Sequence, residues 1–147
     1  MLSNLKVSIE TSLIDVANCF AFLDNPSHGG IVTFLGVVRN NAGKTVIAVT
    51  YDVWEPYALS VFKKIGLAVQ KKYCEDMKIF LSHYKGKLEV GGVSLALGVS
   101  TPHRHDAFLA CREILEVIKV QAPIWKKEHY QEGGSDWLGG HSLCHTP

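Results

Sequence analysis

No apolar run in this 147-residue sequence approaches the roughly 20 residues that a membrane-spanning helix requires; residues 92–99 are typical of its longer apolar stretches. Residues 1–10 alternate polar and apolar side chains and contain neither a charged start nor an apolar core, so a secretion signal is not expected. Internal repeats, low-complexity tracts and composition breaks are also missing. We therefore expect one cytoplasmic domain over residues 1–147.

An excess of charge of one sign is missing too. The formal net charge is +1, whereas a general nucleic-acid-binding protein usually has a strongly basic surface. Four cysteines, at positions 19, 74, 111 and 144, lie far apart without a C-x-x-C pair, and three of them fall within apolar-periodic segments. They are expected to be reduced core thiols. The apolar fraction of 47% and charged fraction of 20% are typical of a folded globular domain.

Apolar periodicity predicts three helices, at residues 12–23, at residues 55–74, and from a cap at residues 100–102 to residue 121. Strands are expected at residues 30–38, 45–54, 77–84, 92–100 and 124–130, with a short extra strand at 87–90. The order β-α-β-β-α-β-β-α-β predicts an α/β or α+β domain with helices packed on a sheet. The tail after about residue 138 has little packing signal, and we expect it to be mobile.

Residues 100–106 (STPHRHD) place His103, Arg104 and His105 at the expected start of a helix. Free backbone amides and the helix dipole favour an anion at this position, and the guanidinium of Arg104 could hold a phosphate or carboxylate with two hydrogen bonds. The alternative interpretation is a solvated first turn with ordinary capping, because charged residues are common at helix ends.

A second group of cations surrounds residues 122–125 (APIW). Lys119 would end a helix, where the dipole alone favours a lysine. Strand alternation sends Lys126 and Lys127 to opposite faces, so we expect only Lys126 to join a site. If Lys119 is half-buried among other cations, its pKa should fall and it could act as a nucleophile or as a general acid or base. Arg39, after a strand in which Gly36 would let a ligand approach the backbone, is a third candidate.

The spacing of these groups limits how they combine. His103 and Lys119 are separated by 16 residues on one expected helix, or about 24 Å at 1.5 Å per residue. One small substrate cannot contact both in one chain. Either they serve two sites, or a symmetric dimer brings the helix start of one subunit to the helix end of the other, and we favour the dimer.

Two further parts of the sequence are weaker candidates. Residues 141–145 (HSLCH) offer three zinc or copper ligands, but a fourth ligand at a recognised spacing is missing, so we expect no metal site. Glu128 is expected to be a structural ion-pair partner of nearby cations rather than a catalytic base.

Three blocks, taken in order, are similar to one known family: residues 30–39 (GIVTFLGVVR), residues 102–108 (PHRHDAF), and residues 119–128 (KVQAPIWKKE). The chain resembles the large subunit of molybdopterin synthase over roughly residues 29–137. The ordered set of blocks is far more specific than any one of them.

This resemblance implies a hammerhead-like α/β fold, with helices on a mixed or antiparallel sheet and a small β-subdomain. It also implies a homodimer that binds a small ubiquitin-like carrier subunit at each end, as a heterotetramer. The carrier ends in a Gly-Gly thiocarboxylate and delivers sulfur to cyclic pyranopterin monophosphate, which yields the dithiolene of molybdopterin. No metal or organic cofactor is implied.

In the family, the positions that match Arg39, His103, Arg104, Lys119 and Lys126 line the pocket. Lys119 and Lys126 are therefore our catalytic candidates. We expect Lys119 to be the acid, base or transient covalent group, Lys126 and Arg39 to bind substrate anions, and His103 with Arg104 to contact the phosphate from the neighbouring subunit.

Some positions depart from the family pattern. Residues 83–86 read HYKG where the family usually has an arginine after the histidine, and the helix after residues 54–57 (WEPY) has no methionine. These departures affect expectations about the pocket rim and the carrier interface more than those about the reaction. Two other functions remain open from the residues alone: a dimeric anion-binding module that is not an enzyme, and a phosphate-ester transferase that uses Lys119 and His103 without a carrier.

Overall fold

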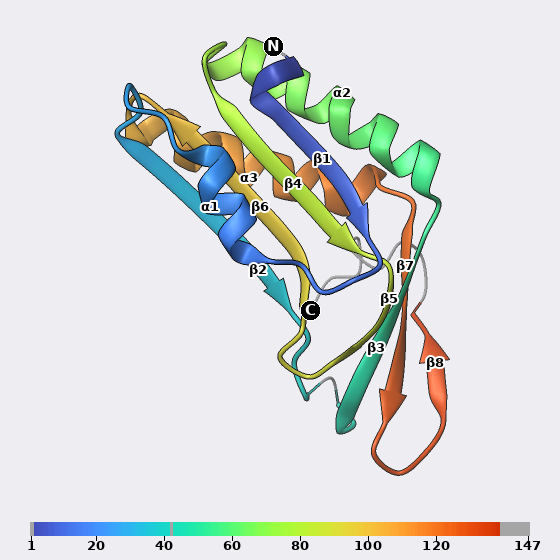
Figure 1. Ribbon diagram of the computed structural model, residues 1–147. Coiled ribbons are helices and arrows are strands. Elements are labelled where there is room, and N and C mark those ends of the chain that lie inside the picture. Colours follow the sequence, from blue (N-terminus) through green and yellow to red (C-terminus); the bar gives the residue numbers. More distant parts are fainter. Residues whose placement is uncertain (1, 42, 139–147) are drawn as a thin grey trace.

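The computed structural model describes residues 2–41 and 43–138 (Figure 1). Its larger sheet, the main sheet, contains four strands in the spatial order β1-β4-β6-β2. β1 is parallel to β4, while the other neighbours are antiparallel, and a short 3-10 turn precedes β1. The bounds are η1 (Leu2–Asn4), β1 (Leu5–Glu10), β4 (Lys78–Tyr84), β6 (Val93–Thr101) and β2 (Gly30–Val37).

A second, smaller sheet extends beyond one end of the main sheet (Figure 1). This small sheet has the order β5-β3-β7-β8, and all of its neighbours are antiparallel. The bounds are β5 (Gly86–Glu89), β3 (Val46–Val53), β7 (Ile124–Tyr130) and β8 (Ser135–Trp137). The expected α/β architecture, with helices on a mixed sheet and a small β-subdomain, is confirmed.

Three helices cover the main sheet. α1 (Val16–Leu23) packs on one face against β4 and β6, while α2 (Glu55–Tyr73) and α3 (Arg104–Gln121) pack together on the other face (Figure 1). α2 forms because Pro56 suits a first helical turn and its apolar residues recur at helical spacing on one buried side. Among the described helices, none is both long and apolar enough to cross a membrane.

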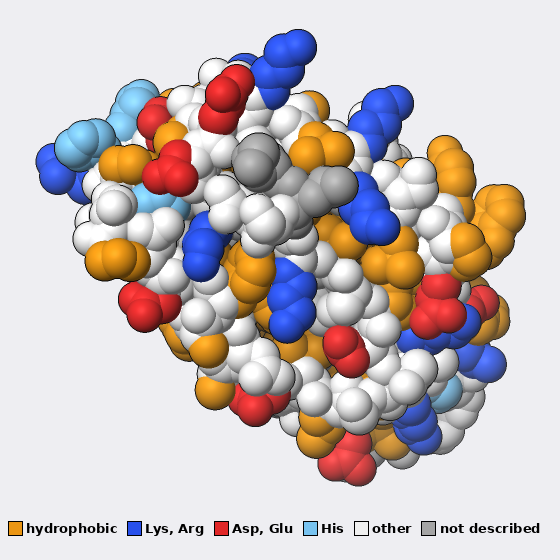
Figure 2. Space-filling view, turned by 45° about the horizontal axis from the view of Figure 1, so that its top comes forward, with side chains coloured by type: hydrophobic (Ala, Val, Ile, Leu, Met, Phe, Trp, Pro, Cys, Tyr) orange, Lys and Arg blue, Asp and Glu red, His pale blue; other side chains and the backbone are white. Residues whose placement is uncertain are grey.

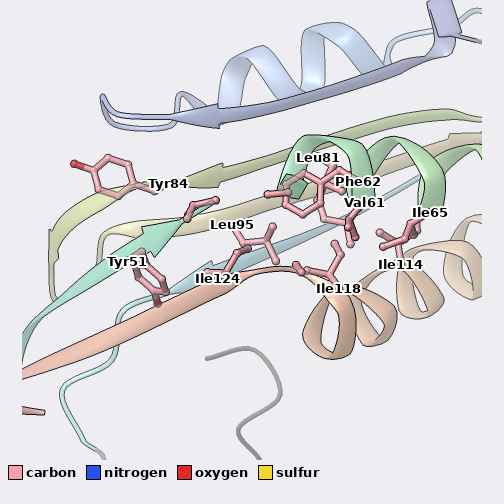
Figure 3. Close-up of a cluster of buried hydrophobic side chains, with 14 of the residues drawn as sticks. Tyr51, Val61, Phe62, Ile65, Leu81, Tyr84, Leu95, Ile114, Ile118 and Ile124 are labelled. Carbon is pink, nitrogen blue, oxygen red and sulfur yellow. The ribbon is translucent and has the colours of Figure 1, made fainter. Parts of the chain in front are cut away.

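The principal core lies between the main sheet and helices α2 and α3 and continues into the small sheet. Phe62 and Ile65 of α2 meet Ile114 and Ile118 of α3, and Ile124 carries the cluster onto β7 (Figure 3). Each large apolar side chain buried in this way contributes roughly 1.5–3 kcal/mol. The end of α3 and the start of β7 are therefore held firmly relative to each other.

A second, smaller core holds α1 against the outer face of the main sheet. Cys19 and Leu23 of α1 are fully buried against Phe80 and Ala96. Gly98 of β6 makes this close approach feasible, because a Cβ at position 98 would collide with Leu23 and lie 2.8 Å from the Sγ of Cys19.

Three differences from the sequence-based expectations have a clear local cause. The first helix begins at Val16 rather than at residue 12, because Asp15 is its N-cap and accepts a hydrogen bond of 3.0 Å from the backbone N–H of Ala17. The predicted cap at residues 100–102 is wrong, since Ser100 and Thr101 end β6 and His103 precedes α3. β8 was not expected, because three mostly polar residues carry no strand periodicity.

Candidate functional site

Three of the candidate cations gather where α3, β7 and the end of β2 meet. Lys119 lies in the last turn of α3, Lys126 lies in β7, and Arg39 is the second residue after β2. Arg39 and Lys119 both act electrostatically on the ammonium of Lys126. The fold therefore concentrates positive charge from three segments of the chain, and we call these three residues the cation cluster.

Lys126 is the most perturbed member of the cation cluster. It is half-buried, and loss of hydration lowers the pKa of its ammonium. Repulsion by Arg39 and Lys119 lowers that pKa further, while the carboxylate of Glu128 opposes the change. A lowered pKa is thus found at Lys126, a residue that the sequence had not singled out for one.

Strand alternation separates Lys126 from its neighbour Lys127. Lys126 faces the interior with Glu128 and Tyr130, both of which are buried, and it pairs with Tyr51 across β3. Lys127 faces the other way, and its Nζ lies 5.6 Å from the ring centroid of Trp137. Of these two neighbouring lysines, only Lys126 therefore belongs to the cation cluster.

Glu128 supplies the negative charge next to these cations. Its side chain is 8% exposed and accepts a hydrogen bond of 3.1 Å from the hydroxyl of Tyr130. A buried carboxylate that is held by a hydrogen bond stabilises the neighbouring ammonium of Lys126 through its charge. The expectation that Glu128 is a structural ion-pair partner rather than a catalytic base stays a prediction.

The remaining candidates lie at the opposite end of α3. Pro102, His103, Arg104 and His105 line a hollow of about 570 Å³ together with Gly29, Phe108 and Leu109. The loop before β2 packs tightly there, since a Cβ at Gly29 would lie 3.0 Å from the carbonyl oxygen of Pro102. In Figure 2, His and Lys or Arg side chains gather at the left edge of the molecule, the side on which α3 begins in Figure 1.

The length of α3 keeps the two groups apart within one chain. Arg104 and Lys119 are 15 residues apart on this continuous helix, so they are separated by about 22 Å along its axis. A small substrate held by the cation cluster therefore cannot reach Arg104 of the same chain.

A groove runs along α3 between these two ends. It has a volume of about 540 Å³ and is lined on one side by β2 and on the other by α3. Phe34 and Phe108 contribute aromatic surface, Lys119 closes one end, and the buried Oγ1 of Thr33 has no hydrogen-bond partner among the described residues. The lining residues are Val32, Thr33, Phe34, Phe108, Cys111, Arg112, Leu115, Glu116 and Lys119.

β2 is an edge strand of the main sheet and exposes apolar side chains beside this groove. Phe108 and Leu109 of α3 are 61% and 42% exposed. The exposed apolar residues of β2 are Ile31, Phe34, Leu35 and Val37. Exposed apolar side chains on an edge strand are typical of an interface with another protein chain.

The space beside the backbone of Gly36 is filled by a neighbouring side chain. A Cβ at this position would lie 3.2 Å from the Oγ of Ser94, which donates a hydrogen bond of 3.2 Å to the carbonyl oxygen of Gly36. The expectation that a ligand approaches Gly36 is therefore not met. Sequence reasoning missed Ser94 and Tyr51 near the cation cluster, because only the strand pairing brings them there.

Within residues 2–41 and 43–138, no group of three His, Cys, Asp or Glu side chains could hold a metal ion. His141, Cys144 and His145 lie outside the described residues. Cys19, Cys74 and Cys111 are free thiols, and burial raises the pKa of Cys19 and of Cys111 to about 11. At neutral pH these two thiols are therefore protonated and inert.

Comparison with known proteins identifies the family. The family model described as MoaE protein matches residues 9–121. A molybdopterin synthase catalytic subunit from a Nostoc species is 36% identical over 141 residues, which cover 91% of this chain and 86% of that protein. The resemblance found from the three sequence blocks is thereby confirmed.

Solved structures agree with this assignment. Molybdopterin synthase from Staphylococcus aureus has a TM-score of 0.83 at 30% identity, covering 93% of this chain and 98% of that one. A complex of subunits 1 and 2 of molybdopterin-converting factor from Helicobacter pylori has a TM-score of 0.77 at 20% identity, covering 95% and 92%, and shares the fold. The family match and these relatives together show that the chain belongs to the MoaE protein family of molybdopterin synthase catalytic subunits.

Proposed function

We propose that this chain is the catalytic subunit of a molybdopterin synthase, which transfers sulfur from a thiocarboxylated carrier protein to cyclic pyranopterin monophosphate. The observation that supports this most directly is the cation cluster. The cyclic phosphate and the thiocarboxylate are both anions and would repel each other at reacting distance. Arg39, Lys119 and Lys126 would neutralise both charges in a half-buried site, where such interactions are stronger than in water.

Within this proposal the residues have distinct roles. Lys119 is the acid, base or transient covalent group, because it lines the groove of about 540 Å³ and lies in the last turn of α3. Lys126 and Arg39 bind the anionic groups of the substrates, and the lowered pKa of Lys126 makes its ammonium a readier proton donor than an ordinary lysine.

The proposal includes a homodimer in which His103 and Arg104 of one subunit contact the phosphate bound by the other. Two features support it: the separation of about 22 Å along α3, and the exposed apolar residues of β2 and α3 beside the groove. A two-fold axis near the middle of α3 would place each helix start next to the partner's helix end.

The second partner is a small carrier subunit with a C-terminal Gly-Gly thiocarboxylate, giving a heterotetramer. The Helicobacter pylori complex of subunits 1 and 2 supports a two-subunit arrangement for this fold. We place the reaction in the cytoplasm, because the three described cysteines are free thiols, as is usual in a reducing compartment.

Reconstitution tests this function. The purified chain is mixed with a thiocarboxylated carrier and cyclic pyranopterin monophosphate, and dithiolene formation is measured. We expect Lys119→Ala to lose at least a hundredfold in rate, within the range typical for removal of a positioned acid or base. Lys127→Ala is the matched control, because this lysine faces the opposite side of β7, and it should retain the wild-type rate.

Two outcomes would contradict the proposal. The first is failure of the wild-type chain to form dithiolene with a verified cognate carrier. The second is an equal effect of the Lys119 and Lys127 substitutions, which would mean that the cation cluster has no special role. Binding of the pterin without sulfur transfer would instead favour an anion-binding module.

A further inference from the structure

Buried side-chain contacts of Tyr51 connect the small sheet to the main sheet. Tyr51 of β3 and Ser94 of β6 are 7% and 6% exposed. The side chain of Tyr51 interacts with the side chain of Ser94, whose hydroxyl donates a hydrogen bond of 3.2 Å to the carbonyl oxygen of Gly36. Tyr51 belongs to the small sheet, while Ser94 and Gly36 belong to the main sheet, so these groups join the two.

These contacts begin and end next to two members of the cation cluster. Tyr51 is paired directly with Lys126 in the register of β3 and β7. Gly36 immediately precedes a register shift in β2, three residues before Arg39. After the shift, Val38 exchanges backbone hydrogen bonds of 3.0 and 2.8 Å with Gly92 and Gly91. The strand that carries Lys126 is therefore connected to the strand end that carries Arg39.

Tight packing leaves this connection little freedom. A Cβ at Gly36 would lie 3.2 Å from the Oγ of Ser94, so the serine sits directly against the backbone of β2. On its other side, the ring of Tyr51 meets the buried ring of His83 edge-on, with 5.1 Å between centroids. Figure 3 shows Tyr51 at the end of the core where the small sheet begins. Movement of either hydroxyl would disturb packed groups on both sides.

We propose that Tyr51 and Ser94 are positioning residues that set the separation of Arg39 from Lys126. Neither hydroxyl is assigned a chemical step. The value of this arrangement for sulfur transfer rests on the proposed function, but the arrangement itself can be tested without it.

The physical reason lies in the repulsion within the cluster. Arg39 and Lys126 are both cations, and without a constraint they would move apart into solvent. The charged groups that act on Lys126 are Arg39 and Lys119, which lower its pKa, and Glu128, which raises it. If Ser94 no longer holds β2 against β3, Arg39 should relax away, and the pKa of Lys126 should rise toward the ordinary lysine value.

The test measures that pKa by NMR of protein labelled with carbon-13 at lysine Cε. The signal of Lys126 is identified as the one missing from Lys126→Gln. We expect Ser94→Ala to raise the pKa of Lys126, and Arg39→Gln to raise it as well. The double variant should show no greater rise than Arg39→Gln alone, because both substitutions remove the same repulsion.

Ser82→Ala is the matched control. Ser82 is 1% exposed and shares a hydrogen bond of 3.0 Å with Ser8 in β1, away from the cations. The Ser82→Ala variant should lose about as much stability as Ser94→Ala, but the pKa of Lys126 should not change. Tyr51→Phe keeps the ring that packs on His83 and removes only the hydroxyl, so it provides a second variant if Ser94→Ala does not fold.

Unchanged titration of Lys126 in both Ser94→Ala and Tyr51→Phe would overturn the proposal. So would additive shifts in the double variant, since they would mean that Ser94 acts without Arg39. In reconstituted enzyme, each variant should raise the KM for the pterin about two- to tenfold, the effect of one lost hydrogen bond, with a smaller change in kcat. Lack of activity in the wild-type chain would count against the proposed function but would leave the NMR result intact.

Discussion

Mixed dimers of two inactive variants provide a quantitative test of a site shared between subunits. The two substitutions are Lys119→Ala and Arg104→Ala, at opposite ends of α3 and about 22 Å apart. If each site combines Lys119 of one chain with Arg104 of the other, one site of a mixed dimer carries both substitutions. Its second site carries neither and should be fully active.

The expected activity follows from this count. Random exchange of subunits makes about half of the dimers mixed, and each mixed dimer has one intact site of two, so about a quarter of the wild-type activity should return. Mixed dimers isolated through two different affinity tags should have about half of the wild-type activity. The assay is dithiolene formation per dimer with a saturating thiocarboxylated carrier.

A second pair of variants controls for non-specific rescue. Lys119→Ala and Lys126→Ala both affect the cation cluster of one chain, so a mixed dimer has one defect in each site and should stay inactive. If the first pair shows only the mean of its two parents, the shared site is refuted. Recovery in the second pair would equally refute it.

Three further predictions concern stability and pH. Burial lowers the pKa of His83 to about 4, and its unfolded value is near 6.5, so the unfolded state binds more protons between these values. In urea unfolding, the free energy of unfolding should therefore decrease by up to about 3 kcal/mol as the pH falls from 6.5 to 4. The decrease should be smaller in His83→Asn. Gly98→Ala should lower the free energy of unfolding by about 1–3 kcal/mol, because the new Cβ overpacks the contact with α1. In the double variant Leu23→Ala/Gly98→Ala, the loss should be less than the sum of the two single losses. Additive losses would contradict the contact. Because the pKa of Lys126 is lowered, the affinity for pyrophosphate measured by calorimetry should fall as the pH rises through that lowered value. Lys126→Arg should remove this decline, because arginine keeps its charge. An identical decline in Lys126→Arg would exclude Lys126 as its source.

Local sequence patterns predicted most of the helices and strands. The apolar face of α2 recurs at helical spacing and is ended at both sides by clear signals, so its expected range differs from Glu55–Tyr73 by one residue. The first helix started later than expected because two capping residues, Ser12 and Asp15, compete within one turn. β8 escaped prediction because it depends on pairing with β7 rather than on its own composition.

The candidate site was predictable only in part. Alternation along one strand sufficed to place Lys126 and Lys127 on opposite faces, because this pattern is local. Tyr51 and Ser94 could not be found in the same way, since they reach the cation cluster through pairing between distant strands. The lowered pKa of Lys126 depends on burial and on Arg39, which are properties of the folded chain.

The pairing of the main sheet also has a consequence for how the chain folds during synthesis. Leu5 of β1 pairs with Ile79, and Gly30 of β2 pairs with Thr101, so both edge strands wait for partners made about seventy residues later. Loops of this length slow folding, because their entropy is lost before any contact stabilises them. On the ribosome, β1 therefore lacks its neighbouring strand until β4 emerges, and β2 lacks its own until β6 emerges, so the apolar faces of both strands stay exposed for longer than those of a helical bundle of equal size.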